Sequence, residues 1–159
     1  MNLISRDIVS EFRPQLISGN IIILIGARQV GKTSILKLLI NDVQASHPKA
    51  PVFYFDLEKE EFLEIFQSHR QLEGWLKLHG GQLDKELYLF IDEFHYIPNP
   101  TKLFKIMHDS WPNVKIIATG SSSLEPFCVS LVLIDNLACL IIFSKLNNFF
   151  TSFSLTLTP

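Results

Sequence analysis

The sequence predicts an α/β fold in which a parallel sheet carries helices on both faces. Three observations support this prediction. The apolar, β-branched run Ile21–Ile25 is typical of a strand that is buried on both faces. Strand-like runs then alternate with helix-like stretches, which is the pattern of βαβ units. A glycine-containing loop with a phosphate-binding pattern lies between the first such strand and the helix that follows it.

Each element follows from its local pattern. Residues 3–12 place apolar side chains at helical spacing, and Pro14 limits that helix. After the first strand, an apolar stripe predicts a helix from about Lys32 to Ala45. The later elements are expected as a strand at Val52–Phe55, one or two helices within residues 60–79 closed by Gly80 and Gly81, a strand at Leu87–Ile91, a short helix around Leu103–Met107 and a strand at Val114–Ala118.

Composition excludes several classes of protein. The 159 residues suit one ordinary domain. The formal net charge of -2, without a basic stripe, gives no strong nucleic-acid signal. The two cysteines, Cys128 and Cys139, form no CxxC pair, so neither a disulfide scaffold nor a zinc motif is expected. Charged residues near the start interrupt any apolar leader, and we therefore expect a cytoplasmic protein.

The loop after the first strand fits the pattern GxxxxGK[ST] at every fixed position. It reads Gly26, Ala27, Arg28, Gln29, Val30, Gly31, Lys32 and Thr33. The glycines let backbone N–H groups surround a phosphate at a helix N-terminus. Lys32 supplies a positive charge for the β- and γ-phosphates, and the Thr33 hydroxyl is a ligand for Mg²⁺. We expect the whole segment to bind phosphate, with Arg28 and Gln29 facing solvent and taking no catalytic role.

Two adjacent carboxylates, Asp92 and Glu93, end the third predicted strand. Ligands of open α/β sheets bind at the carboxyl edge, where this pair is expected. We predict that Asp92 holds Mg²⁺ and that Glu93 polarises the attacking water as a general base. The alternative is a solvated acidic turn. The adjacent glutamate, with no NKxD guanine motif, favours an ATPase over a GTPase. For His95 a packed or hydrogen-bonded loop position is favoured over a place in the site.

Small hydroxyl residues follow the fourth predicted strand. Thr119 and Ser121 are candidates to orient the water or to sense loss of the γ-phosphate, although polar residues at such positions also serve turns. Ser122 is expected to cap a helix, because Ser122–Glu125 fits the S-x-x-E capping box.

Together these segments resemble the prokaryotic AAA-type ATPases with a GxRQxGKT loop. The similarity covers roughly residues 1–125 and rests on Gly26–Thr33, Phe90–Glu93 and Ala118–Ser123. The resemblance implies an ATP-binding P-loop NTPase-type core with strand order 5-1-4-3-2, and ATP and Mg²⁺ as ligands. It also implies that a helical lid and a further domain follow the core.

The resemblance implies a charged helix and an arginine-bearing segment after Glu125. The chain departs from the family there, and no arginine follows Arg70. An arginine supplied by a homo-oligomer or another protein partner would permit hydrolysis. The alternative is a nucleotide-binding module, or a non-functional remnant, without turnover.

Residues 126–159 form an apolar, atypical tail, in which Asp135 and Lys145 are the charged residues. A membrane helix is disfavoured, because the apolar stretch is of borderline length and Asp135 lies near its centre. A replacement fifth strand, at Val129–Ile134 or Leu140–Phe143, is a second alternative. We favour a third, a truncation or frameshift product, which would leave the predicted sheet incomplete.

Overall fold

One sheet runs through the centre of the molecule. The computed structural model describes residues 12–14, 16, 21–121, 138–143 and 150–153. In these residues six strands lie in the order β2-β3-β4-β1-β5-β6. The first five in that order are mutually parallel, and β6 is antiparallel to β5. Their bounds are β1 Ile21–Gly26, β2 Val52–Asp56, β3 Leu87–Asp92, β4 Val114–Ser121, β5 Ala138–Phe143 and β6 Phe150–Phe153.

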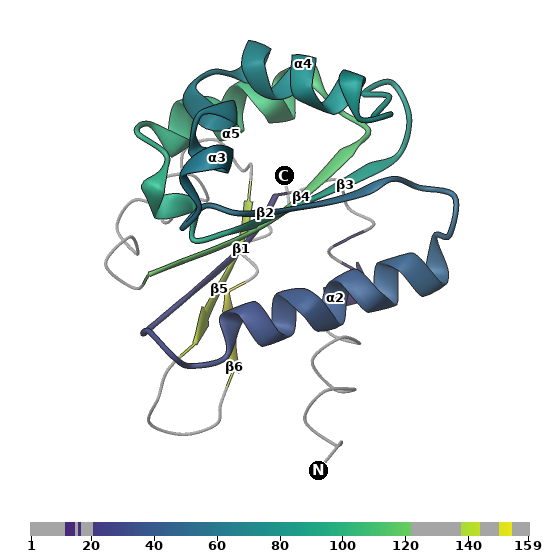
Figure 1. Ribbon diagram of the computed structural model, residues 1–159. Coiled ribbons are helices and arrows are strands. Elements are labelled where there is room, and N and C mark those ends of the chain that lie inside the picture. The colour runs from purple at the N-terminus through teal and green to yellow at the C-terminus, as the bar shows by residue number, and fades with distance from the viewer. Residues whose placement is uncertain (1–11, 15, 17–20, 122–137, 144–149, 154–159) are drawn as a thin grey trace, which may run out of the picture.

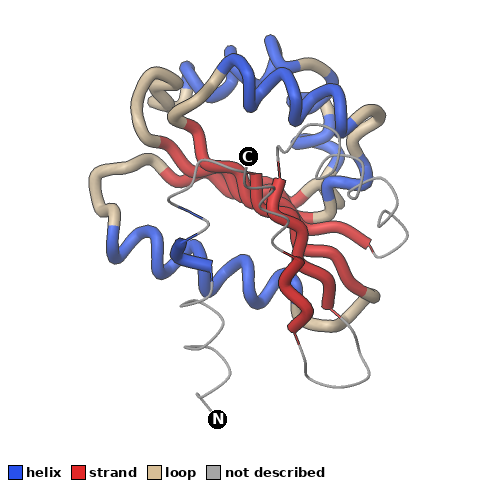
Figure 2. Tube along the Cα trace, turned by 180° about the vertical axis from the view of Figure 1, so that it is seen from behind, coloured by secondary structure: helices blue, strands red, loops and turns tan. Residues whose placement is uncertain are grey.

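Helices cover both faces of this sheet. Helix α2 (Lys32–Ser46) lies on one face, while α3 (Glu60–Leu63), α4 (His69–Leu78) and α5 (Pro100–Ser110) lie on the other (Figures 1 and 2). Two short 3-10 turns, η1 (Ile65–Gln67) and η2 (Phe94–Tyr96), follow α3 and β3. The predicted fold class, a P-loop NTPase-type α/β sheet with helices on both faces, is therefore confirmed.

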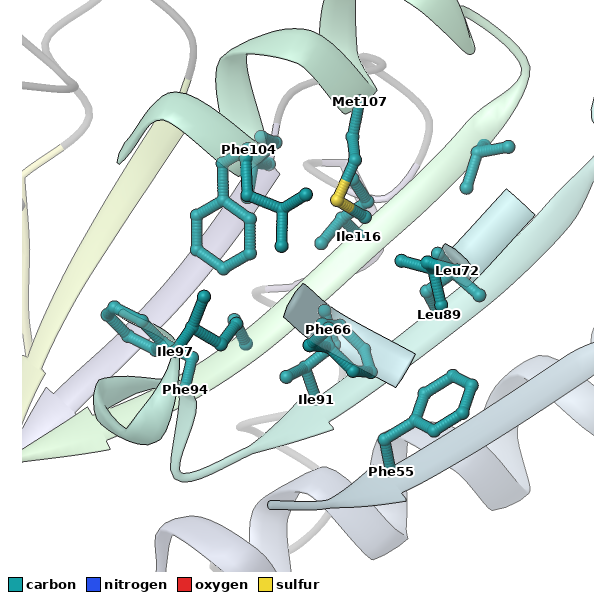
Figure 3. Close-up of a cluster of buried hydrophobic side chains, with 14 of the residues drawn as sticks. Phe55, Phe66, Leu72, Leu89, Ile91, Phe94, Ile97, Phe104, Met107 and Ile116 are labelled. Atoms are coloured by element: carbon teal, nitrogen blue, oxygen red, sulfur yellow. The ribbon is translucent and has the colours of Figure 1, made fainter. Parts of the chain in front are cut away.

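Strands β1 and β3 are buried along their whole length because each face of the sheet has its own core. In β3, Leu89 and Ile91 pack toward the helices α3 to α5, whereas Tyr88 and Phe90 pack toward α2. Figure 3 shows the larger cluster, in which aromatic and aliphatic side chains of the strands meet those of α4 and α5. This two-sided burial explains why hydrophobicity does not alternate along Ile21–Ile25.

Local signals explain where the helices begin. At Ser68 the side chain accepts a hydrogen bond from the N–H of Gln71 at 3.3 Å, which caps α4. Asn99 caps α5 in the same way through the N–H of Lys102, and Pro100 occupies the first turn, where its missing N–H costs nothing.

The strand order 5-1-4-3-2 implied by the resemblance is found. The expectation of an incomplete sheet is wrong, because the tail supplies the fifth strand. Strand β5 pairs with β1 from Ile21 to Gly26, as the alternative at Leu140–Phe143 anticipated. The other placement, Val129–Ile134, lies outside the described residues, as do the cap at Ser122 and most of the predicted N-terminal helix. Whether the tail arose by truncation or frameshift stays a prediction. None of the helices in the described part of the chain has the length and hydrophobicity of a membrane-spanning segment.

Candidate active site

The phosphate loop joins β1 to α2, as its pattern predicts. Lys32, the first residue of α2, is only 5% exposed, and its ammonium donates hydrogen bonds to the carbonyl oxygens of Gly26 and Ala27, each at 3.0 Å. An ammonium has three N–H donors, so one remains after these two bonds. The lysine side chain therefore folds back onto the start of the loop, and its positive charge lies near the N-terminus of α2, where an anion would bind.

Two residues of the loop have left-handed backbone conformations. Gly31 has a φ of 94°, which favours glycine, and Gln29 has a φ of 63° although it carries a side chain. Gly31 is also the N-cap of α2, and no side chain in the described part caps that helix end. The N–H groups of the first turn are thus without a side-chain acceptor, as a phosphate site requires.

The strand tips bring the acidic pair beside this loop. Gly26 at the end of β1 pairs with Ser121 of β4, and β4 in turn lies next to β3. Asp92 is part of β3 and is only 3% exposed. The phosphate loop follows β1 and the acidic pair ends β3, and β4 lies between these two strands. Both features thus lie at the carboxyl ends of the parallel strands, where the sequence predicted them.

Both carboxylate oxygens of Asp92 accept hydrogen bonds from side chains. The hydroxyl of Thr119 donates to Oδ1, and that of Tyr54, on β2, donates to Oδ2 at 3.2 Å. Burial raises the pKa of the Tyr54 phenol well above its ordinary value, and the charges of Asp92 and Asp56 raise it further. Tyr54 therefore stays protonated and remains a donor to the Asp92 carboxylate.

Glu93 is positioned through the same threonine. Its backbone N–H donates to Thr119 Oγ1 at 3.1 Å, and its own conformation is left-handed, with a φ of 57°. Such a conformation is uncommon for a residue with a side chain and persists where neighbouring contacts fix it. Its carboxylate borders a hollow of about 250 Å³, which is lined by Arg28, Gln29, Glu58, Glu93 and His95.

The structure brings most of the predicted site residues to this edge. Arg28 and Gln29 are exposed, as predicted, and Thr33 is half-buried in the first turn of α2. Thr119 is fully buried, with its hydroxyl bonded to Asp92 and Glu93, and Ser121 is half-buried opposite Gly26. Their role as sensors of the γ-phosphate stays a prediction.

Two residues of the site were not predicted. Tyr54 lies two positions before the end of its strand, on the face that also holds Asp92, but a half-buried tyrosine in an apolar strand more often packs against the core. Glu58 follows the tip of β2 and is one of several acidic residues between Asp56 and Glu61, so its position carries no specific signal. To identify these two residues as part of the site, one must know that β2 pairs with β3, and neither segment alone reveals that pairing.

The candidate Mg²⁺ site offers only a few protein ligands. In the described part of the chain no group of three or more His, Cys, Asp or Glu side chains could hold a metal ion. A Mg²⁺ ion at a phosphate site keeps most of its ligands as water and phosphate oxygen and takes only one or two from the protein. The Thr33 hydroxyl and the Asp92 carboxylate fit that requirement. The carboxylate has about four lone pairs, of which two accept hydrogen bonds from Thr119 and Tyr54, so the others are available to a metal ion.

Comparisons with known proteins agree with this architecture. A family model described as "AAA domain" matches residues 18–127. Among solved structures, that of PCH-2 from C. elegans aligns with 87% of this chain and 39% of its own, at 18% identity and a TM-score of 0.54. This chain thus spans less than half of that structure, and at this identity the likeness concerns the fold. Curated proteins gave no match.

Proposed function

We propose, from the premise that this chain belongs to the AAA domain family, that it binds ATP with Mg²⁺ and hydrolyses it. One observation carries the proposal. A complete phosphate loop after β1 and the Asp92–Glu93 pair at the end of β3 lie at the same end of the sheet, and Thr119 of the intervening strand β4 is hydrogen-bonded to both members of the pair. The affiliation with the prokaryotic group whose loop reads GxRQxGKT is part of this proposal and rests on Gly26–Thr33.

The phosphate loop binds the nucleotide through charge and backbone donors. The third N–H of the Lys32 ammonium, together with the N–H groups of the first turn of α2, interacts with the β- and γ-phosphates. The ion pair forms in a nearly solvent-free setting, since Lys32 is 5% exposed. Bound Mg²⁺ would neutralise charge on the phosphate oxygens, and Thr33 and Asp92 are the side chains that would hold it.

Glu93 is the general base. Its carboxylate accepts a proton from water as the water oxygen bonds to the γ-phosphorus, and the bond from that phosphorus to the β–γ bridging oxygen breaks. The products are ADP and phosphate. Positioned bases of this kind contribute a factor of about 10²–10⁴ in rate.

Rapid turnover also requires a cation at the transferred phosphoryl group. An arginine in that role contributes about 10³–10⁵ in rate, and no arginine follows Arg70 in this sequence. We propose that a second copy of the chain or a protein partner supplies it. The same observation favours a second function for the isolated chain, a nucleotide-binding module with little turnover.

Separate measurements of ATP binding and hydrolysis distinguish these functions. Glu93→Gln keeps the shape of the side chain and removes the base, so it should bind ATP like the parent and lose whatever hydrolysis the parent has. Asp92→Asn should instead weaken the dependence of ATP binding on Mg²⁺. Hydrolysis by Glu93→Gln at the parental rate would show that Glu93 is not the base. ATP binding by a parent without turnover at any protein concentration would favour the binding module.

A further inference from the structure

The hollow beside the phosphate loop contains a histidine that the proposed chemistry leaves unused. His95 and Glu93 flank Phe94 in the turn after β3. Phe94 is fully buried and its ring lies 5.4 Å from that of Phe104, in the cluster drawn in Figure 3. This anchor fixes the turn in the core, while the side chains of Glu93 and His95, 20% and 22% exposed, border the hollow.

The backbone of Glu93 is held on both sides. Its N–H donates to the Thr119 hydroxyl, and its carbonyl accepts the N–H of Tyr96 at 3.2 Å. The remaining freedom is rotation of the Glu93 side chain. A general base must lie within hydrogen-bond distance of the water it deprotonates, so this rotation has to be restricted for efficient catalysis.

The imidazole of His95 is the group placed to restrict it. His95 Nδ1 lies 3.1 Å from Glu93 Oε2, and this nitrogen is buried without a well-aligned hydrogen bond to any described residue. Buried polar nitrogens of native proteins nearly always have a partner, and a small rotation of the ring would align this one with the carboxylate. The ring also packs on Tyr96, with centroids 4.4 Å apart, which limits its own movement.

We infer that His95 is a positioning residue for Glu93, an assignment that rests on the proposed hydrolysis. The Nδ1–H donates to Glu93 Oε2 and holds the carboxylate at the hollow that Arg28 and Gln29 of the phosphate loop also line. The second carboxylate oxygen stays free to accept the proton of the attacking water. His95 itself transfers no proton and does not touch the nucleotide.

Three substitutions of His95 separate the hydrogen bond from packing. Asn places an amide N–H near the position of Nδ1, Gln places it near Nε2, and Phe keeps the ring but has no donor. With parental ATP binding in all three, kcat should stay within about threefold of the parent for His95→Asn. It should fall by about ten- to a hundredfold for His95→Gln and His95→Phe, the range typical of lost supporting hydrogen bonds. Parental kcat in His95→Phe, or an equal loss in all three variants, would overturn the assignment.

A spectroscopic test does not depend on turnover. The ring nitrogen shifts of His95 are measured by NMR in the nucleotide-free full chain and in Glu93→Gln, with His108 as an internal control away from the hollow. We expect the Nδ1 shift of His95 to change in Glu93→Gln while that of His108 stays constant. An unchanged Nδ1 shift would refute the contact. If the shift changes but the parent fails to bind ATP, the contact stands and the proposed function fails.

Discussion

Replacement of Thr119 by valine tests how the acidic pair is held. Valine has nearly the shape of threonine but neither donates nor accepts, and Thr119 is fully buried. The substitution removes the donor to Asp92 Oδ1 and the acceptor of the Glu93 N–H. A hydrogen bond to a charged group contributes about 1.5–3 kcal/mol and one between neutral groups about 0.5–1.5 kcal/mol. We therefore expect Thr119→Val to lower the free energy of unfolding by about 2–4.5 kcal/mol, the sum of the two contributions.

The assay is urea unfolding followed by the fluorescence of Trp75 and Trp111. Thr119→Ser is the matched control, because it keeps the hydroxyl and loses one methyl group, at about 1 kcal/mol. In a double-mutant cycle, Thr119→Val should cost less when Asp92 is already alanine, because the carboxylate acceptor is then absent. A loss below about 0.5 kcal/mol for Thr119→Val, or an equal loss for both Thr119 variants, would refute the reasoning.

Two further predictions concern stability. Burial and neighbouring carboxylates raise the pKa of Tyr54 and Tyr88 above the ordinary value of about 10, so the folded chain holds both phenolic protons more tightly than the unfolded chain. This contribution to stability is fully present below a pH of about 10 and is lost as the pH rises further. The urea midpoint should therefore be lower at a pH of about 11 than at a pH of about 9, and the decrease should be smaller in Tyr54→Phe. An equal decrease in the parent and in Tyr54→Phe would contradict this prediction. Deletion of residues 126–159 removes β5, which pairs with all six residues of β1, and should lower the melting temperature and promote aggregation; an unchanged melting temperature with improved solubility would instead favour a dispensable tail.

The sequence predicts the phosphate loop and the acidic pair well because both have local physical causes. A buried strand, two glycines and a lysine at the start of a helix specify the geometry around Lys32 within a few residues. The end of an apolar strand similarly places Asp92 at the edge of the sheet. Each of these positions depends on neighbours in the chain, so a single sequence is enough to find it.

The hydrogen bonds around Asp92 could not be predicted, because they depend on strand register. Strands buried on both faces are apolar throughout, so their pattern does not reveal which residues pair. In the structure Ile91 pairs with Ala118, which places the next residues, Asp92 and Thr119, side by side. Tyr54 reaches the same carboxylate only because β2 lies next to β3.

The tail shows a different limit of sequence reasoning. Its composition predicts apolar structure but does not choose between a membrane helix, a strand and an unselected segment. The sequence offers Leu140–Phe143 as one of two placements for a fifth strand, and the pairing of Ala138–Phe143 with β1 selects it. The place beside β1, rather than the tail's own pattern, identifies β5.

The most direct test of the central claim is titration of the chain with a fluorescent ATP analogue, in the parent and in two lysine variants. Lys32→Ala removes the buried ammonium of the phosphate loop, whereas Lys37→Ala removes an exposed one from the same helix. Circular dichroism verifies that both variants are folded. We expect Lys37→Ala to bind like the parent and Lys32→Ala to lose measurable binding. Parental affinity in a folded Lys32→Ala variant would contradict the assignment of this loop as the ATP site.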